Sequence, residues 1–162
     1  TTKDMPAVLL LAGFQARCTL PVIGAIQMFI NDAQKSAFTL KDATLYGLES
    51  GNPAVSIAVP ELFIAKPSCH LVGFEQSYSH EETGLMARGE RLAVYTSHYV
   101  IQGTFHMGAD ALLNDFIVSN KAPFLGVTDV DVFPLFQAQS AMVQHFPLAY
   151  IHQNTALMHH RV

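Results

Sequence analysis

The feature that most constrains this chain is an internal repeat. Aligned with itself at an offset of 85 residues, the sequence places Phe14, Thr19 and Leu20 on Tyr99, Thr104 and Phe105. Beyond a two-residue insertion near Gly108 the offset becomes 87, and the matched pairs are then Phe29 with Phe116, Asp42 with Asp129, Tyr46 with Phe133, Pro60 with Pro147, and Phe63 with Tyr150. Self-similarity at a fixed spacing indicates one structural unit that has been copied. The sequence therefore predicts two copies of one small module.

Each copy begins with segments typical of a hairpin and a short helix. Residues 7–22 and 92–107 are rich in β-forming side chains with a small or polar interruption, which predicts two strands joined by a tight turn. Residues 23–33 and 108–120 instead place apolar side chains three and four positions apart. That spacing predicts one short helix in each copy, with Asp110 capping the second.

The rest of each copy predicts three more strands. Apolar and polar residues alternate in 38–48 and 124–135, and this period of two is typical of a strand. Residues 54–74 and 141–161 then predict a longer strand, a short polar turn and a last strand. The fold class predicted is mainly β with short helices, as two tandem five-stranded bent barrels. The domain boundaries predicted are 1–74 for the first copy, 75–91 for a polar linker and 92–162 for the second copy.

Composition favours a folded, associating protein. Half of the residues are hydrophobic and only 14% are charged, so the surface must be unusually apolar, and we expect a homo-oligomer or a partner protein to cover part of it. The longest apolar stretch, around Ala7 to Ala12, is too short to span a membrane, and no basic segment followed by an apolar core opens the chain. Cys18 and Cys69 lack metal-type spacing and are expected to be buried free thiols, which fits a cytoplasmic location.

Charge argues against tight binding of nucleic acid by the second copy. Between Leu92 and His160 the only Lys or Arg is Lys121, whereas the same stretch holds four aspartates. Tight binding to a phosphate backbone depends on clustered cationic side chains. Nucleic acid is therefore an unfavoured partner, although neutral contacts and stacking stay open as a way to bind it.

No arrangement of residues predicts an active site, a cofactor or a metal. His152, His159 and His160 could gather as metal ligands, but alternation along a strand sends neighbouring residues to opposite faces. The same alternation separates Cys69 from His70 as a catalytic dyad. The remaining candidates are more simply read as solvated charges or as core: Asp129 with Asp131, His80 with Glu81 and Glu82, and the apolar set Met28, Phe29, Leu112, Leu113 and Phe116.

The second copy resembles the Sm-like (LSm) family of small β-barrels. Gly103-Thr104-Phe105, then Asp110 and Asn114, then the alternating acidic strand at 127–130, resemble the first motif of that family. The turn at 150–158 has the shape of the second motif, with His152 and Gln153 where the family carries Arg and Gly. The predicted helix after Asp110 is a departure, since the family places only a short loop there.

The resemblance implies a ring built by strands pairing edge to edge. Two copies per chain would act as a built-in dimer, so roughly three chains would close a ring of about six modules. It also implies that RNA contacts would fall on Asn114, His152 and Gln153, although losing the turn arginine removes both a charge and a stacking surface.

Three functions are therefore open. The first is a non-enzymatic assembly protein that forms a ring or larger oligomer through strand edges and apolar surfaces. The second is an Sm-like protein that contacts single-stranded RNA near a ring pore. The third is a small-ligand binder or enzyme with a pocket between the copies.

Overall fold

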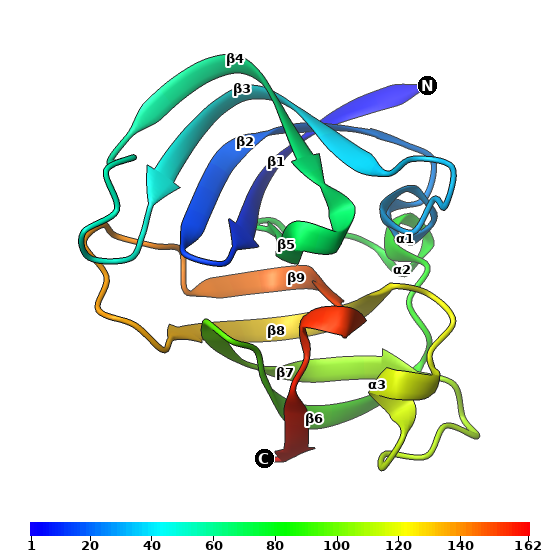
Figure 1. The fold of residues 1–162 in the computed structure, drawn as a ribbon. Coiled ribbons are helices and arrows are strands. Elements are labelled where there is room, and N and C mark those ends of the chain that lie inside the picture. The colour runs from blue at the N-terminus through cyan, green and yellow to red at the C-terminus, as the bar shows by residue number, and fades with distance from the viewer.

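A computed structural model describes all 162 residues as one ten-stranded antiparallel sheet with short helices at its margins (Figure 1). The prediction of a mainly β fold is confirmed. The elements up to the linker are β1 (Thr2–Leu11), β2 (Phe14–Ile23), α1 (Ile26–Ile30), β3 (Ala37–Gly47), β4 (Ile57–Ala65), the 3-10 turn η1 (Lys66–Ser68) and β5 (Cys69–Phe74).

The linker and the C-terminal half repeat this order. The elements are α2 (His80–Thr83), β6 (Arg88–Tyr95), β7 (Tyr99–Met107), α3 (Phe116–Ser119), β8 (Phe124–Pro134), β9 (His145–His152), the 3-10 turn η2 (Gln153–Thr155) and β10 (Met158–Arg161). The sheet runs β10-β6-β7-β8-β9-β5-β1-β2-β3-β4. Within each half, the last strand therefore lies beside the first, and the other strands follow in sequence.

The strand registers of the two halves correspond at the offsets found in the sequence. Val8 lies opposite Gly73 and Arg17 in the N-terminal half, and Ala93 lies opposite His160 and Gln102 in the C-terminal half. The other ladders match in the same way: Arg17 with Thr44 and Gln102 with Asp131, Lys41 with Glu61 and Thr128 with Leu148.

The irregularities of the two halves also coincide. The register shifts after Arg17 in the ladder between β2 and β3, and after Gln102 in the ladder between β7 and β8. Asp42 and Asp129 are the only non-glycine residues with positive φ, at 48° and 51°. A left-handed conformation is uncommon outside glycine, and aspartate is among the residues that tolerate it best. Each half thus bends its third strand at the same position by the same device.

The core explains why the β1 sequence is apolar without alternation. Two clusters of 19 buried residues lie on the two faces of the central strands, and β1 contributes Leu9 to one and Leu10 to the other. β5 does the same with Val72 and Leu71, and all six of its residues are buried. Strands covered on both faces read as continuous apolar runs.

The two predicted five-stranded bent barrels are not confirmed, because one open sheet of ten strands runs through both halves and ends at β4 and β10. Two other expectations need correction. The second helix begins at Phe116, with Asp115 rather than Asp110 at its N-cap position. The linker also holds structure: Ser79 and Glu82 form a capping box that starts α2, and β6 begins at Arg88, inside the predicted linker.

Candidate assembly interface and a pocket beneath the linker

The two halves meet strand to strand. The antiparallel ladder between β5 and β9, here called the internal junction, has four pairs: Leu71 with Ile151, Val72 with Tyr150, Gly73 with Ala149, and Phe74 with Leu148. All eight residues are buried. Gly73 is required here because a Cβ would approach the Phe146 ring to 2.5 Å. The last strand of one half therefore pairs with the fourth strand of the other.

Side chains add specific contacts across the internal junction. The Asn31 amide nitrogen donates to the Phe124 carbonyl at 3.2 Å, and the Phe124 backbone N–H donates to the Asn31 amide oxygen at 2.8 Å. The rings of Phe38 and Phe124 pack with their centroids 5.7 Å apart. The Tyr150 hydroxyl donates to the Thr83 carbonyl in α2, which ties the linker to the same place.

The two outermost strands, here called the free edges, have no such cover. β4 and β10 end the sheet, and they lie at opposite ends of the molecule, with β4 at the top of Figure 1 and the red C-terminal strand at the bottom. Phe63 in β4 is 64% exposed, whereas Tyr150, its counterpart at the offset of 87, is fully buried. Met158 in β10 is 60% exposed, whereas its counterpart Leu71 is fully buried. Unpaired edges bearing large apolar side chains are sites where another strand can add.

Three histidines lie close to the end of the internal junction. His70 is buried, its ring stands edge-on to His98 and Tyr99, and its Nδ1 has no hydrogen-bond partner. Burial, followed by repulsion from His98 and His152, lowers the pKa of His70 to about 4. Burial also lowers the pKa of His152. The folded chain therefore favours the neutral form of both rings.

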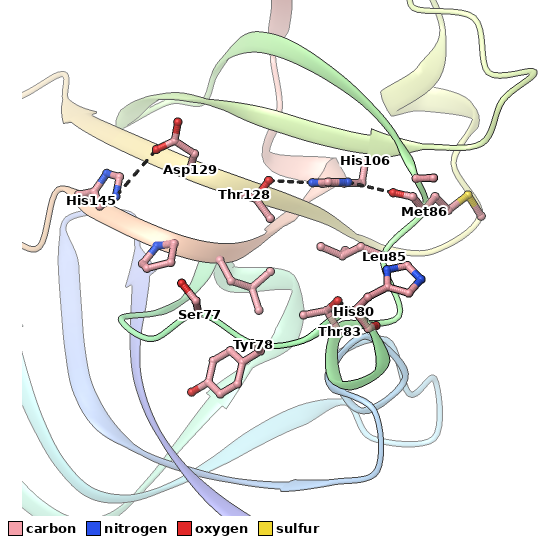
Figure 2. A pocket seen from close by; sticks show the side chains of 13 residues that line it. Ser77, Tyr78, His80, Thr83, Leu85, Met86, His106, Thr128, Asp129 and His145 are labelled. Carbon is pink, nitrogen blue, oxygen red and sulfur yellow. Dashed lines mark hydrogen bonds and ion pairs between the residues drawn. The ribbon is translucent and has the colours of Figure 1, made fainter.

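A pocket of about 660 Å³ lies between the linker and strands β7 to β9 (Figure 2). His106 is fixed on its wall: the Met86 carbonyl can only accept, so Nδ1 donates to it at 2.9 Å, and in the neutral ring Nε2 accepts from the Thr128 hydroxyl at 2.8 Å. The linker contributes Ser77 and His80 from the opposite side, as Figure 2 shows.

The acidic strand forms an ion cluster beside this pocket. His145 Nδ1 lies 2.9 Å from an Asp131 carboxylate oxygen, and its Nε2 lies 4.0 Å from Asp129. Arg91 approaches both carboxylates, at 3.4 Å for Asp129 and 3.8 Å for Asp131. The two aspartates, which the sequence indicated as solvated charges, thus share the same ion-pair partners. No serine, threonine or cysteine side chain hydrogen-bonds to His145, so the cluster lacks the nucleophile of a triad.

The residues predicted from the Sm-like resemblance fall in different environments. His152 is buried against Phe124, with ring centroids 4.7 Å apart, and its Nδ1 accepts from the Asn154 N–H. The Gln153 amide, oriented with its nitrogen toward α3, donates to the carbonyls of Ile117 and Asn120. Asn114 is exposed in the loop before α3. The structure places His152 and Gln153 together at η2, and their contact with RNA stays a prediction.

Cys18 and Cys69 are free, and Cys69 is buried. Asn31, which contacts the other half, was not among the predicted site residues. Glu61, on the free edge β4 next to the repeated proline Pro60, was not among them either.

Searches of protein-family models, of curated proteins and of solved structures find no match to this chain. None of the helices has the length and apolar character needed to cross a membrane.

Proposed function

We propose that this chain is a non-enzymatic assembly protein: two tandem Sm-like modules, derived by duplication, that join further copies of the chain through their free edges into a ring or larger oligomer. The observation that carries the proposal is the contrast in burial between equivalent residues. Tyr150 is buried at the internal junction, while Phe63 is exposed at the corresponding place on β4.

The proposal gives the exposed apolar surface a use. Ile57 and Phe63 on β4, and Leu157, Met158 and Val162 at β10, are all exposed in the single chain. Large exposed apolar side chains grouped on a sheet edge are unfavourable for a monomer and favour association. The two free thiols fit assembly in a reducing compartment such as the cytoplasm.

The test is the mass of the native protein. Native mass spectrometry and size-exclusion chromatography with light scattering, at micromolar concentration, should give a discrete multiple of the single-chain mass. A ring of the Sm-like kind would contain about three chains. A monodisperse monomer at these concentrations would overturn the proposal.

The pocket beneath the linker supports a second candidate, the binding of a small polar ligand. Its volume of about 660 Å³ lies within the range of small-molecule sites, and the residues that line it include His80, His106, His145 and Asp129. A thermal-shift screen of metabolites should then find a compound that raises the melting temperature of the native chain but not of a His106→Ala variant. If no compound shifts the native chain, this candidate is withdrawn.

A further inference from the structure

We infer that the free edges pair with each other between chains, β10 of one copy antiparallel to β4 of the next, in the register of the internal junction. This inference rests on the proposed function and specifies its interface. The partner is a second copy of the same chain, and the contact joins two different surfaces rather than one surface with itself.

The register follows from the correspondence between the halves. At the offset of 87, β10 residues 158–161 correspond to β5 residues 71–74, and β4 residues 61–64 correspond to β9 residues 148–151. The internal ladder then predicts four pairs between chains: Met158 with Ile64, His159 with Phe63, His160 with Leu62, and Arg161 with Glu61.

The lengths of the free edges fit this ladder. The internal junction contains four pairs, and β10 contains four residues, Met158 to Arg161. Pro60 lacks a backbone N–H, but it falls one residue outside the predicted ladder, just as Pro147 precedes the first paired residue of β9. Pro60 therefore does not block the predicted ladder, and it marks the position where the ladder ends.

The charges at the end of the ladder are complementary. Glu61 and Arg161 are both exposed, and neither forms an ion pair within the chain. The register places Arg161 of one chain directly opposite Glu61 of the next, where the internal junction has Phe74 opposite Leu148. Opposite charges at directly facing positions favour a strand pair, and like charges oppose it. The alternative pairing of β10 with β10 would bring Arg161 and the adjacent histidines of two chains together.

Charge reversal tests the register. Glu61→Arg and Arg161→Glu each place like charges opposite one another, and each should weaken the association of chains about tenfold. The double variant restores opposite charges and should recover most of the affinity. Both side chains are exposed, so folding should be unchanged, and circular dichroism checks this. Affinity is measured by sedimentation velocity over a concentration series.

Edge-blocking variants test the direction of pairing. Phe63→Lys puts a charge on exposed β4, and Met158→Lys does so on exposed β10. Each variant alone should be monomeric. An equimolar mixture, with one partner isotopically labelled, should form a heterodimer through the remaining intact edges.

The outcomes separate the inference from the proposed function. Dimers of either blocked variant alone would show that an edge pairs with itself, which overturns the inference. If native chains assemble and neither the charge reversals nor the blocked edges change the mass, the register is wrong while assembly stands. If native chains do not assemble, the proposed function itself fails.

Discussion

The internal junction and the free edges are equivalent surfaces with opposite exposure. At the junction, Leu71, Phe74 and Tyr150 are fully buried, and the Asn31 side chain bonds to the backbone of the other half. At the free edges the corresponding ladder positions carry exposed apolar side chains and two unpaired charges. The position that corresponds to Asn31 is Val118, which is exposed and cannot make the amide contacts. The structure thus contains one such strand ladder that is formed and buried, and two sheet edges that are free.

This difference separates the folding of the chain from its assembly. The linker keeps β5 and β9 at a high effective concentration, so the internal junction forms within the chain. The free edges lack both the linker and the Asn31 contacts, so the pairing proposed for them would depend on protein concentration. We expect the chain to fold as a monomer and to assemble in a second, weaker step.

The largest expected effect distinguishes the two surfaces by the aromatic rings at their equivalent positions, one buried and one exposed. Tyr150→Ala removes a fully buried ring from the core and should lower the free energy of unfolding by about 3 to 5 kcal/mol. Phe63→Ala removes its exposed counterpart and should change the stability of the monomer by less than about 0.5 kcal/mol while weakening assembly. Urea denaturation of dilute protein measures both. Equal losses of stability in the two variants would contradict the contrast between junction and edge.

The next effect is the dependence of stability on pH contributed by His70, which lies at the end of the internal junction. The pKa of His70 is lowered to about 4 by burial, so the unfolded chain takes up this proton more readily between about pH 6.5 and pH 4. The contribution of neutral His70 is complete above about pH 6.5 and is lost as the pH falls toward 4, where the loss is at most about 3 kcal/mol. Unfolding in urea at a series of pH values should show this loss.

The control for this effect uses the corresponding residue of the other half. Leu157 occupies the position equivalent to His70, so His70→Leu should flatten the pH dependence between pH 6.5 and pH 4. It should also remove a buried nitrogen that has no partner. His80→Gln, at an exposed position of the linker, is the matched control. An unchanged slope in His70→Leu would contradict the assignment of this loss to His70.

The sequence predicted the repeated order of strands because each strand carries a local signal. Alternation in β8, paired prolines in β4 and β9, and the shift of offset near Gly108 all depend on neighbouring residues. The capping box of α2 was also present as Ser79 followed by Glu82, although the polar composition of the segment indicated a plain linker. The helix predicted to begin at Asp110 does not form there. Leu112 is exposed, so the apolar spacing near Asp110 does not mark the buried face of a helix.

What the sequence could not provide is the joining of the halves into one sheet. The pairing of strands that are far apart in the sequence, such as Val72 with Tyr150 across 78 residues, depends on long-range packing that leaves no local pattern. The contact of Asn31 with Phe124 spans 93 residues and has no equivalent in the other half, so the repeat could not reveal it. The sequence carries one signal of this arrangement. The apolar run in β1 is typical of a strand that is covered on both faces in the middle of a larger sheet.

A smaller effect is expected from the Asn31 contacts. Asn31→Ala leaves the N–H and the carbonyl of Phe124 without their partner and should cost about 1 to 3 kcal/mol of stability. Val118→Ala at the equivalent exposed position should cost almost nothing. Hydrogen exchange would place the Asn31→Ala loss at the internal junction, with faster exchange in β8. If both variants behaved like the native chain, the side-chain contacts would add nothing to the strand ladder.

The smallest effect concerns the linker, which only the internal junction possesses. The Ser79 hydroxyl accepts from the Glu82 N–H, so Ser79→Ala should lower the free energy of unfolding by about 1 kcal/mol. Ser77→Ala, in the same linker but outside the capping box, should have no measurable effect. Because α2 holds the Thr83 carbonyl against the Tyr150 hydroxyl, the Ser79→Ala loss should shrink when Tyr150→Phe is already present. Strict additivity of the two changes in urea denaturation would show that the linker caps its own helix without supporting the junction.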